Sequence, residues 1–214
     1  PMAIKDLFCT NGIRTTAGSK ILNNFVPTYE STVSQNIWNE GAILLGKLNC
    51  DEFAMGSSNE TSFFGNVQNP INQNLVPGGS SGGSSSALAG NLTPVTIGTD
   101  TGGSIRGPAD LNGIVGLRPT WGRVSRHGLL LFCWSMDAGG PMTRTVEDTA
   151  LVMNAIAGYD PKDSLTSKLP VPDYTKCLTT DVRGLRAGLL MEFMEPGFTS
   201  EEVRKSIMDA VSPG

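Results

Sequence analysis

The sequence predicts an α/β fold, with a mixed, mostly parallel β-sheet that is covered by helices. Short apolar segments bounded by glycine or polar residues are typical of buried strands, and three occur: Met2–Ile4, Ala42–Leu48 and Val95–Gly98. Segments with apolar residues at helical spacing lie between and after them, as in proteins whose helices pack on both faces of a sheet. A chain of 214 residues is long enough to bury such a core.

The helices are expected over four ranges: Ser31–Glu40, Ser84–Gly90, Thr145–Ala157 and Glu201–Val211. Thr145 is the expected N-cap of the third, because Asp148 follows three residues later. Ser200 is the expected N-cap of the last helix. Leu185–Met191 shows a weaker pattern of a fourth strand.

The composition excludes several classes of protein. Charged residues make up 17% of the chain and apolar residues 39%, which is typical of a globular protein and not of a disordered tail. The net charge of -4 argues against direct binding of nucleic acid, and no apolar run reaches membrane-spanning length. The four cysteines form no C-x-x-C pair, which argues against a zinc site or a disulfide scaffold. We therefore expect a protein of the cytoplasm or an organelle interior, with no membrane contact.

Glycine and serine are concentrated in one run, Pro77–Ser86, within a chain that has 26 glycines. A flexible linker is one interpretation of such a run. However, the run leads directly into a predicted helix and a predicted strand, where linkers rarely occur. A phosphate-binding loop is a second interpretation, but a P-loop requires a lysine, and no Lys or Arg lies between Lys47 and Arg106.

The segment Gly98–Pro108 has the features of an acyl-transfer site. Ser104 follows two glycines, where the backbone can turn sharply and expose a nucleophile. Backbone N–H groups around Thr101, Gly102 and Gly103 are placed to stabilise a developing oxyanion. His127 is the only histidine and has no obvious partner carboxylate, so a Ser-His-Asp triad is poorly supported and His127 is expected to be a surface or supporting residue.

A lysine can serve as the base instead, if burial lowers its pKa. Lys5 and Lys47 each end an apolar run, and the spacing does not choose between them. Most lysines bury only the aliphatic part of the side chain and keep the ammonium in solvent, so this is the commoner interpretation for either residue.

Three motifs together resemble the amidase signature family: Gly78–Ser84, Gly98–Pro108 and Gly116–Ser125. The opening Ile4-Lys5-Asp6 is similar to the lysine segment of the family. The resemblance implies the amidase-signature fold, with residues 1–214 forming its catalytic core. It also implies a fragment of a longer chain, with N-terminal helices and a C-terminal part missing.

The resemblance assigns roles to individual residues. Ser104 is the implied nucleophile, Ser80 a bridging serine that follows a cis peptide bond, and Lys5 the base. Lys47 becomes a structural residue, and Asp100 and Arg106 are expected to hold the motif loops by hydrogen bonds and ion pairing. Thr101, Gly102 and Gly103 form the implied oxyanion hole.

Within the family, Tyr29–Val33 and Asp51–Ser58 are most similar to the glutaminase subunits of tRNA-dependent amidotransferases. The similarity implies glutamine hydrolysis and delivery of ammonia to a B subunit, which uses ATP and Mg to amidate misacylated Glu-tRNA(Gln), while a C subunit braces the pair. It implies no cofactor in this chain and tRNA contact only through the complex. The implied substrate loop consists of Ala54, Met55, Gly56 and Ser57, and the residues that bind the α-groups of glutamine are expected outside this chain.

Two other functions stay open at this point. One is a stand-alone amidase that acts on small amides. The other is a non-catalytic interaction domain on the same scaffold, and the joint presence of Lys5, Ser80 and Ser104 counts against it.

Overall fold

The structure, a computed structural model, describes residues 1–179, 181, 183–186, 188–195 and 197–211. These residues form two compact units, Pro1–Leu178 and Thr179–Gly214. The first unit contains all five strands, and the second contains the helix α5 (Glu201–Val211) and the 3₁₀ helix η3 (Met191–Met194). That residues 1–214 form one catalytic core stays a prediction.

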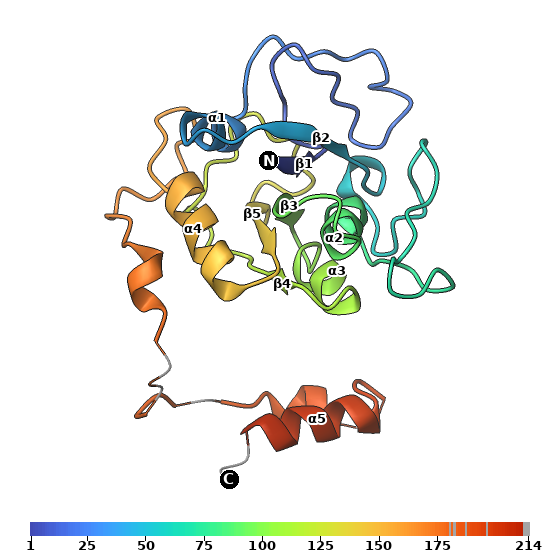
Figure 1. Cartoon of the computed structure of the whole chain (residues 1–214), viewed down its shortest axis with the longest axis vertical. Coiled ribbons are helices and arrows are strands. Elements are labelled where there is room, and N and C mark those ends of the chain that lie inside the picture. The colour runs from blue at the N-terminus through green and yellow to red at the C-terminus, as the bar shows by residue number, and fades with distance from the viewer. Residues whose placement is uncertain (180, 182, 187, 196, 212–214) are drawn as a thin grey trace. The chain divides into compact units, whose positions relative to one another are not determined.

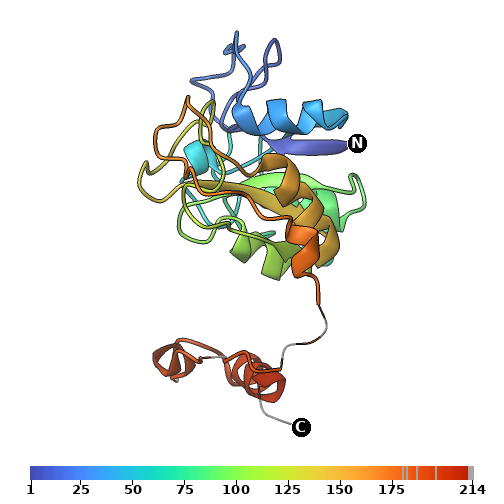
Figure 2. The same ribbon diagram turned by 90° about the vertical axis from the view of Figure 1, so that its left-hand side faces the viewer.

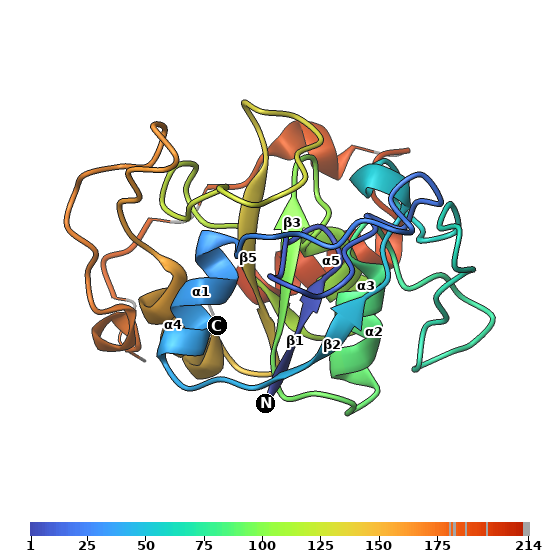
Figure 3. The same cartoon turned by 90° about the horizontal axis from the view of Figure 1, so that it is seen from above.

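The sheet of the first unit has the strand order β2-β1-β3-β5-β4. The bounds are Met2–Lys5 for β1, Leu44–Leu48 for β2, Thr96–Asp100 for β3, Val115–Gly116 for β4 and Ala138–Thr143 for β5. The pairs β1/β2 and β1/β3 are parallel, while β3/β5 and β4/β5 are antiparallel. The predicted α/β fold with a mixed sheet is confirmed, and Figure 3 shows β2, β1, β3 and β5 side by side.

Helices cover both faces of this sheet (Figure 1). α1 (Thr32–Asn39) and α4 (Val146–Ile156) lie together on one face, and α2 (Gly82–Ala89) and α3 (Arg106–Leu111) lie on the other. The N-terminal loops of residues 6–30, in blue, extend beyond α1 at one side of the unit (Figure 2). Short 3₁₀ helices occur at Glu52–Ala54 (η1) and Tyr174–Cys177 (η2).

The helix starts follow the predicted capping. The Ser31 hydroxyl accepts a hydrogen bond from Ser34 N, and Thr145 Oγ1 accepts one from Asp148 N at 3.0 Å. In the second unit, Ser200 Oγ accepts a bond from Val203 N at 3.4 Å, so the predicted cap of α5 is also present. Within the part of the chain that the structure describes, no helix is long and apolar enough to cross a membrane.

Two apolar clusters hold the sheet between its helix layers. The larger cluster, on the side of α1 and α4, includes Ile4, Phe8, Ile37 and Met153, and the smaller, on the side of α2 and α3, joins these residues: Leu88, Ile105, Ala109 and Met142. All four residues of β1 are buried, which fixes the position of Lys5 at its end. Burial of apolar area of this kind is the main stabilising contribution to a core.

One predicted strand is absent from the described residues, and two strands, β4 and β5, were not predicted. No described residue of Leu185–Met191 lies in a strand, and Met191 instead begins η3; residue 187 of that range lies outside the described residues. The strand β5 was not predicted, because its sequence AGGPMT contains two glycines and a proline. Gly140 is nevertheless required there, since Leu117 O occupies the position where a Cβ would lie.

Candidate active site

The predicted site residues meet at one edge of the sheet. Lys5 ends β1 and Asp100 ends the neighbouring parallel strand β3, so both strands deliver side chains to the same edge. The Gly/Ser run turns above this edge and enters α2 at Gly82. The run is therefore an ordered part of the candidate site and not a flexible linker.

Lys5 is fully buried, and three hydroxyl groups surround its ammonium. Lys5 Nζ donates to Ser80 Oγ at 2.7 Å, to Ser81 Oγ at 2.8 Å and to Thr99 Oγ1 at 2.8 Å. Burial lowers the pKa of Lys5 to about 8, against the opposing effect of these acidic neighbours: Cys50, Asp51, Asp100 and Asp137. A substantial fraction of Lys5 is therefore neutral near pH 8 and available as a base.

Ser81 restricts how the Lys5 amine can turn. Ser81 Oγ donates its only proton to Thr99 O at 3.1 Å and accepts a bond from Thr99 N at 3.2 Å. Toward Lys5, Ser81 is consequently an acceptor only, and one N–H of the amine must point at it. With a second N–H on Thr99 Oγ1, the lone pair of the neutral amine faces Ser80 Oγ.

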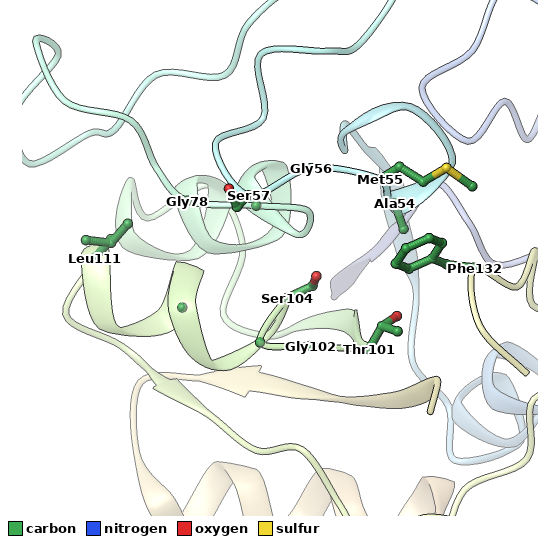
Figure 4. Close-up of a pocket in the computed structure, with 13 residues that line it drawn as sticks. Ala54, Met55, Gly56, Ser57, Gly78, Thr101, Gly102, Ser104, Leu111 and Phe132 are labelled. Atoms are coloured by element: carbon green, nitrogen blue, oxygen red, sulfur yellow. The ribbon is translucent and has the colours of Figure 1, made fainter. Parts of the chain in front are cut away.

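Ser104 lies in the turn after β3 and is 9% exposed. It lines a cavity of about 460 Å³, a size typical of small-molecule sites. All the predicted substrate-binding and oxyanion residues line this cavity: Ala54, Met55, Gly56, Ser57, Thr101, Gly102 and Gly103. Figure 4 shows the Ser104 side chain extending into the space between Leu111 on one side and Phe132 with Ala54 on the other.

The backbone around Ser104 leaves donors for an oxyanion. The N–H of Gly103 is occupied, since it donates to Asp100 Oδ1 at 2.9 Å. Among the described residues, no protein acceptor is bonded to the N–H groups of Thr101, Gly102 and Ser104. The oxyanion prediction therefore rests on these three groups, and Gly103 contributes by its turn, with a φ of 126°.

The buried Asp100 carboxylate holds this turn in place. It accepts bonds from Gly103 N and Ile105 N, and from Arg106 Nε and Nη2 at 3.1 Å each. Arg118 Nε lies 3.2 Å from Asp100 Oδ1. Burial alone would raise the pKa of Asp100, but the bonds from Arg106 and the backbone lower it below its usual value. The contacts expected of Asp100 and Arg106 are thus present.

Ser80 is bonded to Lys5 but not to the Ser104 side chain. The peptide bond between Gly79 and Ser80 is cis, as the family resemblance implied. Ser81 N donates to Ser104 O at 3.3 Å, which brings the two serine segments together. In the described part of the chain, no hydrogen bond joins Ser80 Oγ to Ser104 Oγ. The structure therefore assembles Lys5 with Ser80 and places Ser104 beside them.

Comparison with known proteins agrees with this geometry. The model of the Amidase family matches residues 1–212. The chain belongs to the amidase family. The A subunit of glutamyl-tRNA(Gln) amidotransferase from Pelagibacter ubique is 63% identical over 201 residues, which cover 94% of this chain and 41% of that protein. The chain thus spans about 41% of the length of this curated relative.

Solved structures of amidases show the same fold. The A subunit of glutamyl-tRNA(Gln) amidotransferase from Thermotoga maritima superposes with a TM-score of 0.79 and 47% identity, over 80% of this chain and 38% of that one. The peptide amidase of Stenotrophomonas maltophilia superposes with a TM-score of 0.78 and 41% identity, over 82% of this chain and 38% of that one.

Lys47, the alternative base, lies elsewhere in the fold. Its Nζ pairs with Asp6 Oδ1 at 3.1 Å and donates to Phe8 O and Thr15 Oγ1 at 2.7 Å each. Burial lowers the pKa of Lys47, and the Asp6 carboxylate opposes that shift. Lys47 thus ties the loop after β1 to β2 and does not line the cavity of Ser104.

His127 is also absent from the lining of the Ser104 cavity. Its Nδ1 lies 3.5 Å from Thr32 Oγ1, and its ring lies 6.0 Å from that of Tyr29. These residues line a separate cavity, so His127 is a supporting residue.

Sequence reasoning assigned no role to several residues at or near the candidate site, among them Ser81, Thr99, Phe132 and Asp51. Ser81 and Thr99 lie within the motifs but could not be distinguished from their neighbours there. Phe132 and Asp51 carry no periodic or compositional signal. In the described residues, no group of three or more His, Cys, Asp or Glu side chains is placed to hold a metal ion.

Proposed function

We propose that the protein that carries this chain hydrolyses glutamine and supplies the ammonia for amidation of misacylated Glu-tRNA(Gln). The observation that carries the proposal is the fully buried Lys5, bonded to Ser80 at 2.7 Å beside a cavity that contains Ser104. The amidotransferase relatives, at 63% and 47% identity, support glutamine as the substrate.

The chemistry begins with a proton relay. As Ser104 Oγ attacks the amide carbon, its proton passes to Ser80 Oγ and the Ser80 proton passes to the neutral Lys5 amine. This step requires the Ser104 side chain to turn toward Ser80 when substrate binds. The carbonyl oxygen becomes an oxyanion, which the N–H groups of Thr101, Gly102 and Ser104 stabilise.

The tetrahedral intermediate then collapses. The C–N bond breaks, Lys5 returns its proton through Ser80 to the leaving nitrogen, and ammonia departs from an acyl-Ser104 ester. Water repeats the sequence on the ester, releases glutamate and restores the Ser104 hydroxyl. This chain needs no cofactor for either half of the reaction.

The ammonia passes, in this proposal, to a B subunit that uses ATP and Mg to activate the tRNA-bound glutamate. A C subunit braces the two, and tRNA is bound through the complex. The residues that bind the α-groups of glutamine lie outside this chain. The complex works in the cytoplasm or an organelle interior.

A stand-alone amidase is the second candidate. The likeness to the peptide amidase, with a TM-score of 0.78, favours it, and the Ser104 cavity has apolar residues such as Met55 and Phe132 on one side. Such an enzyme would use the same Lys5–Ser80–Ser104 chemistry on other amides.

The test is ammonia release from glutamine by the full-length protein with its B and C partners, for wild type and Ser104→Ala. We expect the variant to lose activity while it still binds its partners. Unchanged activity in the variant would reject Ser104 as the nucleophile.

The two candidates differ in their response to the complex. A rise in glutamine hydrolysis when the B and C partners and Glu-tRNA(Gln) are added would support the amidotransferase function. No rise, together with rapid turnover of simple amides, would support the stand-alone amidase.

A further inference from the structure

Asp51 lies at the point where the cavity wall meets the Ser80 segment. Its side chain is fully buried, and its Oδ2 accepts a bond from Asn59 N at 3.0 Å. Its Oδ1 accepts bonds from Thr61 Oγ1 at 2.9 Å and Thr61 N at 3.4 Å. The carboxylate therefore closes the loop that carries the predicted substrate wall, Ala54–Ser57.

The Asp51 carboxylate fits only because the two residues packed against it, Gly56 and Gly79, have no side chain. A Cβ on Gly56 or on Gly79 would overlap the Asp51 carboxylate, and a Cβ on Gly79 would also lie 2.8 Å from Ser57 C. Neither glycine adopts a positive φ, so glycine is needed here for space and not for backbone conformation. One glycine belongs to the substrate wall and the other precedes Ser80, so both segments pack directly on Asp51.

The backbone of Asp51 joins the same two segments. Asp51 N donates to Ser80 O at 3.3 Å, and Ala54 N donates to Asp51 O at 2.9 Å. Among the described residues, no ion pair includes Asp51 or Lys5. A buried carboxylate without a cationic partner is costly, and its retention between two active-site segments calls for a role there.

We propose that Asp51 is a positioning residue of the active site, which holds the Ala54–Ser57 wall at a fixed distance from Ser80. The inference rests on the proposed amide hydrolysis. Displacement of reacting groups by about 1 Å is enough to slow an enzyme by roughly 100-fold.

The charge of Asp51 also acts on the base. The acidic groups near Lys5 are Cys50, Asp51, Asp100 and Asp137, and each of them opposes the effect of burial on the Lys5 pKa. Cys50 remains a neutral thiol, because burial raises its pKa to about 12. Removal of the Asp51 charge lowers the Lys5 pKa and leaves Asp100 and Asp137 as the negative charges around it.

The first variant is Asp51→Asn in the full-length protein with its partners. Whichever way the asparagine amide turns, its NH₂ faces the N–H of Asn59 or of Thr61 and cannot accept that bond, so the wall should loosen. We expect kcat/KM for glutamine to fall roughly 10- to 100-fold, mostly through KM, and the acid limb of the pH profile to move to lower pH.

The matched control is Asp160→Asn. Asp160 is also buried, accepts bonds from Thr32 Oγ1 and Ser125 Oγ at 2.6 Å each, and lines the separate cavity of His127. Loss of a buried carboxylate outside the candidate site should lower only stability. We therefore expect Asp160→Asn to have a smaller free energy of unfolding, with KM and pH profile at wild-type values.

The second series does not depend on Asp51→Asn being folded. In Gly56→Ala the new methyl group overlaps the carboxylate, so KM should rise, whereas Gly46→Ala has nothing within 4 Å of the new methyl and should be neutral. In the double variant Gly56→Ala with Asp51→Ala, the methyl fills vacated space. We therefore expect a loss smaller than the product of the two single losses.

Labelling of Ser104 by a fluorophosphonate provides a readout that does not need glutamine. A wild type that is labelled but releases no ammonia from glutamine would refute the proposed function, and the labelling rates of the variants would still test Asp51. Wild-type KM and pH profile in Asp51→Asn, or independent effects of Gly56→Ala and Asp51→Ala, would overturn the inference.

Discussion

Lys5 and Lys47 lie on adjacent parallel strands, yet their surroundings differ in one decisive respect. In the register of β1 and β2, Lys47 pairs with Ile4 and Lys5 pairs with Leu48. Because side chains alternate along a strand, the two lysines point to opposite faces of the sheet. Lys5 meets three hydroxyl groups, and Lys47 meets the Asp6 carboxylate at 3.1 Å.

The comparison shows that burial alone does not make a lysine a base. Burial lowers the pKa of both residues. The carboxylate beside Lys47 favours the ammonium form, whereas hydroxyl groups around Lys5 accept bonds from the ammonium and the amine alike. The identity of the hydrogen-bond partner therefore distinguishes Lys5, the proposed base, from Lys47.

The largest effect is expected for Lys5→Met, which keeps the apolar stem and removes the base. Hydrolysis of glutamine should fall by roughly 10²- to 10⁴-fold, the usual contribution of general-base catalysis. The measurement is ammonia release at pH 8 by the full-length complex. Activity within a factor of ten of wild type would assign the base to another group.

The pH dependence follows from the same lysine. Lys5 must be neutral to act, and its pKa is about 8, so kcat/KM should rise with pH and level off above that value. Two pH units below the pKa, the rate should be about 100-fold lower than on the plateau. A profile that is flat between pH 6 and 9 would contradict the role of Lys5.

A smaller effect is expected for Ser81→Ala, which removes one of the three acceptors of Lys5. The amine loses its fixed direction, and the ammonium loses a stabilising bond, so the pKa of Lys5 falls. The rate should drop roughly 10-fold and the acid limb should move to lower pH.

Ser84→Ala is the matched control, because Ser84 is also buried in α2 and its hydroxyl donates to Ile97 O. Equal changes in both variants would show that Ser81 acts only through packing.

The smallest effect on catalysis is expected for Lys47→Met. This variant leaves the Asp6 carboxylate without its cation, so the free energy of unfolding should fall by about 3–5 kcal/mol, as for other buried pairs. At temperatures where the variant is folded, Ser104 labelling should change less than about threefold, since neither Lys47 nor Asp6 lines the Ser104 cavity.

Urea denaturation and labelling of the same samples separate the two quantities. A loss of labelling in folded Lys47→Met would mean that the two lysines act as one system.

The sequence predicted the parts of the fold that have a strong local signal. Apolar runs located β1, β2 and β3, and capping residues located α1 and α4. The strand β5 was missed because its sequence contains two glycines and a proline, and the need for Gly140 depends on contact with Leu117 and not on local propensity.

The candidate site divides in the same way. Motif residues such as Ser104 were found from the sequence. Spacing left Lys5 and Lys47 open, and the family resemblance chose Lys5. Asp51 begins a segment that carries the family resemblance, but it received no role of its own, because its contacts include two glycines, one of them 28 positions away at Gly79. Contacts that join distant segments leave no periodic trace in the sequence.

The pairing of Ile4 with Lys47 also makes catalysis a reporter of correct strand alignment. If β1 slipped by one position in the sheet, the Lys5 ammonium would turn to the opposite face and away from Ser80, and Ile4 would take its place among the hydroxyl groups. Such a misaligned molecule could retain its helices and much of its compactness. It would lack the contact of Lys5 with Ser80, so under the proposed mechanism ammonia release would come only from molecules whose strands are in the correct register.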